Sequence, residues 1–301
     1  VNNADWTEPV GILDFLRDVG KYVTVNQMLA KDSVRNRLDS GDGLSFTEFS
    51  YSLLQANDFR HLYEHCGVEL QAGGSDQWGN IVAGVDLIRR RLGQHAHALT
   101  HPLVTKADGT KFGKTASGAV WLDATATSPY QFRQFWVNVD DQMVPTYLKR
   151  FSLRPLVDVL GLIGEHEGAP ERRAGQRALA EEMTLLVHGA EAAEAAGAAA
   201  AVLFGGDPAA ASAAALAVVQ QEVPASVVPL SALDDPIGLL VACGLAGSNG
   251  DARRTLTQRG YRANGRQMDE DTSLATVALL HGRYLLLRKG RTAHHLVEVS
   301  G

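Results

Sequence analysis

A short segment at 106–115, KADGTKFGKT, combines three lysines with two glycines. Ammonium groups on such a loop can neutralise the charge that develops on phosphate groups during their transfer. The segment ends like a Walker A loop, but that motif needs four residues between its glycines, and only three separate Gly109 from Gly113. The pattern predicts a phosphate-handling loop, with a solvated lysine-rich loop as the alternative. The lysines concerned are Lys106, Lys111 and Lys114.

A glycine-containing stretch at 73–80, GGSDQWGN, stands between an expected strand at 68–72 and an expected helix at 81–91. Glycines there let the backbone approach a ligand closely, and the start of a helix favours anions. The side chains of Asp76 and Gln77 could bind ribose hydroxyls or a carboxylate. A tight turn without a ligand is the alternative interpretation.

A third set of polar residues lies on an expected helix at 46–66. Tyr51, Gln55 and Asp58 are spaced by four and three residues, so that they share one helix face. Apolar residues surround this stripe, which favours a pocket because buried polar groups need partners and a ligand can supply them. A carboxylate and an amide in an apolar pocket suit a ligand with a hydroxyl and an ammonium group. The alternative is a solvated stripe.

These motifs together resemble a known family. GGSDQWGN followed by PLVTKADGTKFGKT resembles the bacterial tyrosyl-tRNA synthetases, which are class I enzymes, and KFGKT matches that family's form of the KMSKS loop. VNNADW and SFTEFSYSLLQANDF are also similar to that family. LLVACGL and ARRTLTQRGYRANGRQM resemble an S4-type RNA-binding domain, so the likeness extends over essentially the whole chain.

The resemblance implies a role for each matching residue. Asp58 would accept a hydrogen bond from the tyrosine hydroxyl, and Tyr51 and Gln55 would hold its α-amino group. The remaining contacts would be Gln77 with the tyrosine carboxylate, Gly74 and Asp76 with the ATP ribose, and Lys106, Lys111 and Lys114 with the departing pyrophosphate, Lys114 also binding ATP. Tyrosine, ATP with Mg²⁺, and tRNA(Tyr) are the implied ligands, with a cytoplasmic homodimer as the implied assembly and no dedicated metal site.

One family feature is missing from the sequence. Class I synthetases carry a HIGH-like motif that binds ATP, and no such motif is present, since His95, His97 and His101 lie in another context. The chain also begins at Val1. We therefore expect that an N-terminal segment, including the first strands of the sheet, is missing.

The elements that position these residues fall into three expected domains. Residues 1–128 predict part of an α/β, Rossmann-like nucleotide-binding domain. Residues 129–223 predict an all-helical domain that would bind the anticodon arm, and 235–301 a small α+β, S4-like RNA-binding domain, with a linker at 224–236 between them. Two helices are expected within 9–38 and strands at 99–104 and 119–122. Local signals are capping boxes at Thr24/Gln27 and Ser45/Glu48, a helix start at Ser128-Pro129, and an Asn264-Gly265 hairpin turn.

Charge is unevenly distributed along the 301 residues. The whole chain has a net charge of −6, whereas residues 251–301 contain nine Arg or Lys and five Asp or Glu. A basic end on an acidic protein indicates a polyanionic partner, with a solvated basic face as the alternative. The arginines expected to contact RNA are Arg253, Arg254, Arg259 and Arg262, with Arg266 nearby.

Composition excludes several other classes of protein. No apolar run reaches the roughly 18 residues of a membrane span, and Cys66 and Cys243 are too few and too distant for a disulfide framework. Two further functions remain as alternatives: a P-loop kinase or nucleotidase, and a catalytically silent RNA-binding module. A tryptophanyl enzyme is the nearest related class, but it would need a different pocket from Asp58 and 73–80.

Overall fold

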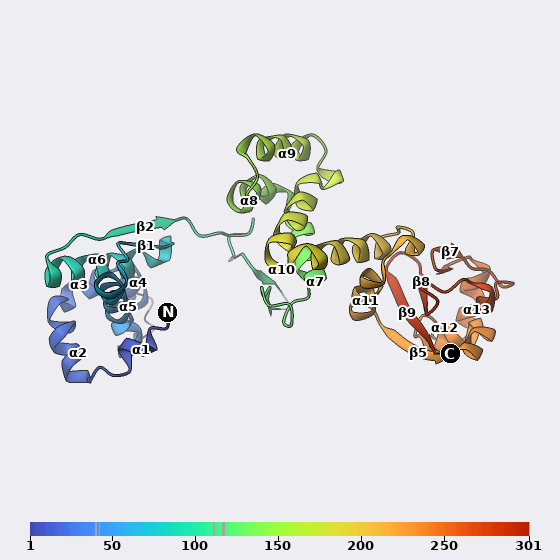
Figure 1. The fold of residues 1–301 in the computed structure, drawn as a ribbon, viewed down its shortest axis with the longest axis horizontal. Helices are drawn as coiled ribbons and strands as arrows, with labels where there is room; N and C mark the ends of the chain where they lie inside the picture. The colour runs from blue at the N-terminus through green and yellow to red at the C-terminus, as the bar shows by residue number, and fades with distance from the viewer. Residues whose placement is uncertain (40, 42, 111, 116–117, 301) are drawn as a thin grey trace. The chain divides into compact units, whose positions relative to one another are not determined.

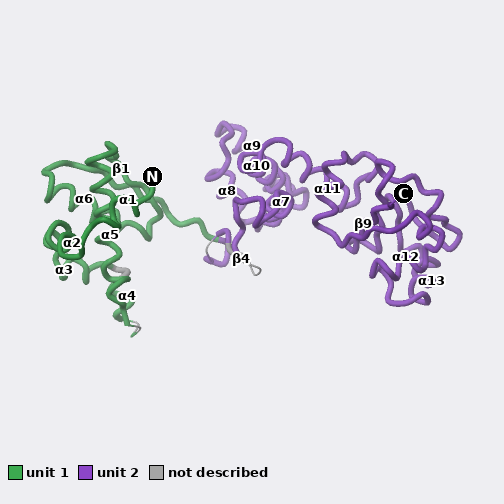
Figure 2. Tube along the Cα trace, turned by 60° about the horizontal axis from the view of Figure 1, so that its bottom comes forward, with its two compact units in different colours: residues 1–105 green, residues 106–301 purple. Residues whose placement is uncertain are grey.

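The computed structural model describes residues 1–39, 41, 43–110, 112–115 and 118–300. Two compact units divide the chain, Val1–Thr105 and Lys106–Gly301 (Figure 2). Within the described ranges, no helix combines the length and apolar character needed to cross a membrane.

Unit 1 is built around two long helices and a parallel strand pair (Figure 1). Its helices are α1 (Ala4–Thr7), α2 (Ile12–Asp18), α3 (Val25–Leu29), α4 (Asp32–Asp39), α5 (Phe46–Cys66) and α6 (Trp78–Leu92), with 3-10 turns η1 (Gly20–Tyr22) and η2 (Ser75–Gln77). Its strands are β1 (Leu70–Gly74) and β2 (His97–His101), paired in register from Leu70 opposite His97.

Local capping signals set the helix starts of unit 1. Both predicted capping boxes are confirmed: Thr24 and Gln27 exchange hydrogen bonds at α3, and Ser45 and Glu48 do so at α5. The expectation of two helices in 9–38 was too simple, because this stretch forms α2, η1, α3 and α4. Strand β2 ends at His101, before the proline that cannot donate to a ladder, rather than at 104 as expected.

Unit 2 begins with a two-stranded hairpin, continues through helices, and ends in a five-stranded sheet. The helices are α7 (Pro129–Val137), α8 (Val144–Phe151), α9 (Leu156–Gly168), α10 (Ala174–Leu203), α11 (Ala213–Glu222), α12 (Pro236–Ala242) and α13 (Asn249–Thr257). The 3-10 turns are η3 (Asp141–Met143), η4 (Pro170–Arg172), η5 (Pro208–Ala210), η6 (Leu230–Asp234) and η7 (Leu274–Thr276). The strands are β3 (Lys114–Thr115), β4 (Gly118–Ala119), β5 (Ala225–Pro229), β6 (Tyr261–Ala263), β7 (Arg266–Gln267), β8 (Tyr284–Lys289) and β9 (Ala293–Ser300).

The part of unit 2 that was expected to be helical consists of helices. Ser128 caps α7, accepting a hydrogen bond from the amide of Gln131, with Pro129 in the first turn. The long helix α10 is two helices joined at Gly189, whose φ of 83° and ψ of 172° are readily adopted only by glycine. The expected strand at 119–122 is reduced to Ala119, which pairs with Lys114.

The predicted linker at 224–236 was wrong, because 225–229 form strand β5. This strand pairs in parallel with β9, which places it at one edge of the sheet in the order β5-β9-β8-β6-β7. Pro224 precedes β5 and Pro229 is its last residue, and proline is tolerated beside a strand and on an edge strand. The Asn264-Gly265 turn is confirmed, since it joins β6 to β7 with positive φ at both residues.

The sheet of unit 2 has a separate apolar core on each face. On one face Leu285, Leu287 and Val297 pack with residues of α12 and α13. On the other, Leu286 and Leu296 pack with residues of α10 and α11. Because side chains alternate along a strand, each residue's position decides which core or surface it meets.

Close packing between α5 and α6 gives a first prediction. A Cβ added to Gly84 on α6 would lie 2.8 Å from Cδ1 of Phe59, which is fully buried. We expect Gly84→Ala to lower the free energy of unfolding by about 1–2 kcal/mol, because overpacking outweighs the better helix propensity of alanine. Urea denaturation measures the change.

The matched control is Gly164→Ala in α9, where nothing lies within 4 Å of the added Cβ. This substitution should leave stability unchanged or raise it by up to about 1 kcal/mol. Equal effects of the two substitutions would contradict the packing argument.

Candidate functional site

The polar stripe on α5 is organised around Asp58. Its Oδ1 accepts a hydrogen bond from the indole nitrogen of Trp6 at 2.8 Å, and its Oδ2 accepts one from the amide of Asn3 at 3.0 Å. The Trp6 ring stacks on His61 with centroids 4.3 Å apart. A carboxylate has about four lone-pair sites, so two held donors fix its orientation and leave acceptor capacity for a ligand.

Sequence reasoning had not assigned a structural role to Asn3 or Trp6. They precede Asp58 by more than fifty residues, and no local spacing rule joins them. The available signal was chemical: tryptophan and asparagine carry donors that need acceptors when they leave water. The resemblance of VNNADW to the family pointed to the segment but not to this contact.

The other two residues of the stripe lie in different surroundings. Tyr51 is 56% exposed, and Gln55 is half-buried. Tyr51 lines a hollow of about 280 Å³ together with Lys31 and Asn80, whereas Gln55 and Asp58 are not among its lining residues. Burial lowers the pKa of Lys31, whose ammonium nitrogen has no hydrogen-bond partner in the described structure.

The predicted order of strand, turn and helix is present around the glycine stretch, but the bounds differ, because the strand covers 70–74 instead of 68–72 and the helix 78–92 instead of 81–91. β1 ends at Gly74, η2 makes the turn, and α6 begins at Trp78. A Cβ on Gly74 would lie 2.8 Å from Oδ1 of Asp76, so the absence of a side chain is what lets this carboxylate lie beside the strand end. Gln77, which directly precedes α6, accepts a hydrogen bond of 3.4 Å from Asn80 in the first turn of that helix, and this contact orients its amide.

The lysine loop belongs to unit 2 and opens with a tight turn. The amide of Lys106 donates to the carbonyl of Thr110 at 2.8 Å, and Gly109 has a φ of 79°. Thr110 donates to Asp108 from its hydroxyl at 2.6 Å and from its amide at 2.9 Å. These hydrogen bonds, with the charge of Lys106 adding, lower the pKa of the Asp108 carboxyl.

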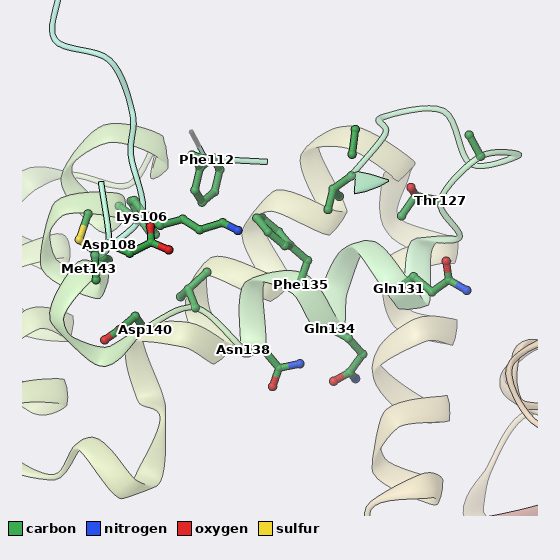
Figure 3. A pocket seen from close by; sticks show the side chains of 16 residues that line it. Lys106, Asp108, Phe112, Thr127, Gln131, Gln134, Phe135, Asn138, Asp140 and Met143 are labelled. Atoms are coloured by element: carbon green, nitrogen blue, oxygen red, sulfur yellow. The ribbon is translucent and has the colours of Figure 1, made fainter. Parts of the chain in front are cut away.

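An aromatic cluster holds the middle of this loop. The Phe112 ring lies 4.7 Å from that of Tyr147, 5.1 Å from Phe135 and 5.3 Å from Trp136, centroid to centroid. A cavity of about 940 Å³ opens beside the cluster, and Figure 3 shows the Lys106 side chain extending toward Phe112 and Phe135. Lys106 is thus placed at a cavity wall.

The structure describes less of the other two lysines of this loop than of Lys106. Lys111 and the side chain of Lys114 lie outside the described residues. The backbone at Lys114–Thr115 is strand β3 and pairs with β4. A P-loop needs its Gly-Lys-Thr to open a helix. The nucleotidase alternative is therefore wrong.

The basic residues at the end of the chain divide between two faces. Arg253 and Arg254 lie exposed on α13, and Arg259 lies just after it. Arg254 pairs with Asp251 at 3.0 Å, and hydrogen bonds from Gly247, Arg254 and Lys289 lower the pKa of that carboxyl. Among described residues, Arg253 and Arg259 have no ion pair.

Arg262 does not share this face. Its neighbours in β6, Tyr261 and Ala263, are buried in the core under α12 and α13, so Arg262 points to the opposite side of the sheet. The predicted RNA-contacting set therefore consists of two groups.

Comparison with known proteins settles the family. The model described as tRNA synthetases class I (W and Y) matches residues 1–205, and the one described as Tyrosine--tRNA ligase SYY-like C-terminal domain matches 216–297. The tyrosine–tRNA ligase of Roseiflexus castenholzii is 51% identical, covering 99% of this chain and 72% of its own. The chain belongs to the tyrosine–tRNA ligase family of class I synthetases.

Other members of the family agree. The tyrosine–tRNA ligase of Streptomyces coelicolor is 49% identical and covers 100% of this chain and 72% of its own. A C-terminally truncated mitochondrial tyrosyl-tRNA synthetase from Coccidioides posadasii superimposes with a TM-score of 0.55 at 34% identity, covering 65% of this chain and 56% of its own. The expected family and fold class are confirmed.

The contact between Trp6 and Asp58 gives a second prediction. Trp6→Phe removes the indole donor while keeping an aromatic ring against His61. We expect it to lower the free energy of unfolding by about 1–2 kcal/mol, as for a hydrogen bond to a charged acceptor. A double-mutant cycle with Asp58→Ala, which removes the acceptor, isolates the pair, and a coupling free energy near zero would contradict the predicted contribution.

Proposed function

We propose that this chain carries out the chemistry of its relatives: ATP-dependent activation of tyrosine to tyrosyl-adenylate and transfer of tyrosine to the 3′ end of tRNA(Tyr). The single observation that carries the proposal is Asp58, a carboxylate held by Trp6 and Asn3 on the face of α5 with acceptor capacity to spare. A phenol hydroxyl suits that capacity. The two bacterial relatives described above are named tyrosine–tRNA ligases, which supports the same substrate.

The proposed roles divide between recognition and charge stabilisation. Asp58 accepts from the tyrosine hydroxyl, Tyr51 and Gln55 hold the α-amino group, and Gln77 lies near the carboxylate. Asp76 contacts the ATP ribose beside Gly74. The α-amino contacts agree with a half-buried amide on the same helix face as Asp58.

The reaction needs no general base from the protein. The carboxylate of tyrosine is already ionised at neutral pH and attacks the α-phosphorus of ATP, so a bond from carboxylate oxygen to phosphorus forms as the bond to pyrophosphate breaks. The protein aligns the reactants and stabilises phosphate charge. Lys106, Lys111 and Lys114 supply positive charge to the departing pyrophosphate.

Mg²⁺ enters this scheme with ATP. Among the described residues no group of three or more His, Cys, Asp or Glu is placed to hold a metal ion. Mg²⁺ is commonly bound through substrate phosphates with few protein ligands, so the ion would arrive on the ATP phosphates and neutralise part of their charge. A homodimer in the cytoplasm completes the proposal.

The first test is tyrosine-dependent exchange of labelled pyrophosphate into ATP. Exchange should occur with tyrosine and not with phenylalanine or tryptophan, because neither of these carries the phenol hydroxyl that would donate to the remaining acceptor sites of Asp58. Asp58→Asn should reduce the preference for tyrosine over phenylalanine by roughly 10- to 100-fold, the value of one charge-assisted hydrogen bond.

The matched control is Asp86→Asn, which removes the same charge from an exposed pair with Arg89 on α6. It should leave the preference unchanged. Absence of exchange in the folded protein, with RNA binding retained, would instead favour the silent RNA-binding module.

The RNA-binding proposal rests on α13. Arg253→Gln should weaken tRNA binding and reduce the slope of log affinity against log salt by about 1, since one phosphate contact is lost. Arg283→Gln is the control, because Glu298 already neutralises that arginine. Filter binding over a range of salt concentrations measures both, and an unchanged slope for Arg253→Gln would remove this residue from the interface.

A further inference from the structure

Three basic side chains lie in one row across the sheet of unit 2. In the strand register Arg262 of β6 is opposite Arg288 of β8, and Arg288 is opposite His294 of β9. Residues directly opposite on neighbouring strands point to the same side of the sheet, and like charges in such positions repel. The repulsion within this row is therefore unfavourable unless a group of opposite charge compensates it.

The row faces a cavity of about 450 Å³ on the side of the sheet that packs with α10 and α11, opposite α13. Figure 1 shows the end of α10 leading to this sheet. The loop after α10 covers the row closely, since a Cβ on Gly205 would lie 3.9 Å from Nη1 of Arg288. The hairpin tip at Gly265 meets the same loop at Pro208.

Two polar atoms of the row are buried without a partner in the described structure. They are Nε of Arg288 and Nε2 of His294, and His294 is only 9% exposed. An orphaned donor on an arginine is costly, and native structures rarely leave one unexplained. An anion entering the cavity would satisfy the Arg288 donor and neutralise the row.

The charges around the cavity also favour an anion. Its charged lining residues are Arg262, Arg266, Arg288 and Asp207, with His294 as the titratable neighbour. The carboxylate of Asp207 accepts from the amide of Ala209, and no ion pair joins it to these arginines in the described structure. Arg262 donates to the carbonyl of Gly265 at 2.9 Å, which orients its guanidinium near the cavity.

We propose that this cavity is a binding site for a phosphate group, held by Arg288 with Arg262 and by His294. Planar guanidinium groups match phosphate oxygens, and the cavity is large enough for a phosphorylated small molecule. The site is independent of the tyrosine chemistry proposed above. It also lies on a different face of the sheet from the α13 arginines.

Proton uptake accompanies binding at His294. Its Nδ1 lies 3.0 Å from the carbonyl oxygen of Thr292 and therefore carries the proton, which leaves Nε2 without one in the neutral ring. Burial, with the charge of Arg288 adding, lowers the pKa of His294. An anion that cannot donate a proton, such as sulfate, therefore binds His294 only in its imidazolium form. Its affinity should rise as the pH falls from about 7 to about 5.

The test follows the imidazole resonance of His294, assigned by its loss in His294→Gln, during titration with sulfate and with inorganic phosphate at constant ionic strength. We expect saturable shifts for both anions and stronger sulfate binding at lower pH. Arg288→Gln should weaken binding at least tenfold. Arg291→Gln, which removes a nearby exposed charge outside the cavity lining, should change it less than twofold.

Separate measurements test whether the variants fold and which molecule supplies the bound phosphate group. Arg288→Gln relieves repulsion within the row and should keep or raise Tm. If it fails to fold, His294→Gln is the second variant, and by calorimetry its sulfate affinity should become independent of pH. Competition with tRNA identifies the source: displacement of sulfate from His294 assigns the phosphate to RNA, and no displacement assigns it to a small phosphorylated molecule.

Two results would overturn the proposal. One is the absence of any saturable shift at His294 with sulfate, phosphate or tRNA. The other is an equal loss of binding in Arg288→Gln and Arg291→Gln, which would show a general charge effect. Neither result bears on pyrophosphate exchange, so failure here and failure of the proposed activity remain distinguishable.

Discussion

Polar atoms that leave water on folding must find hydrogen-bond partners, and this constraint connects the main features of the protein. Asp58 meets it through Trp6 and Asn3, which lie at the start of unit 1, more than fifty residues earlier in sequence. In unit 2, Gln176 donates to Asp141 within the helical part. Asp58 has hydrogen-bond partners within the protein and can still accept further hydrogen bonds, so a polar ligand can bind there.

The sheet of unit 2 shows the same constraint together with strand alternation. One face is covered by α12 and α13, with the exposed arginines on the outside of α13. The other face is covered by α10 and α11. Beyond the part of this face that α10 and α11 cover, the row of Arg262, Arg288 and His294 lies beside a cavity and not against an apolar core. A small domain of this kind thus offers two basic surfaces with different geometry.

Elements governed by neighbours in sequence were predictable. The capping boxes at Thr24 and Ser45 and the Asn264-Gly265 turn depend on contacts within a few residues, and each is present. Strand β5 was missed because prolines before it and at its end are typical of a linker, and only pairing with β9, some seventy residues away, makes it a strand. The roles of the individual site residues remain predictions.

The sequence by itself determined the family and the local structure around the motifs, because long motifs and short-range hydrogen bonds are contained in consecutive residues. The tertiary structure alone decided that Trp6 holds Asp58 and that Arg262 faces away from α13. It also decided that Arg262, Arg288 and His294 form one row. The reason is physical: strand register and packing bring distant residues together, and no spacing along the chain encodes which distant partner a side chain will meet.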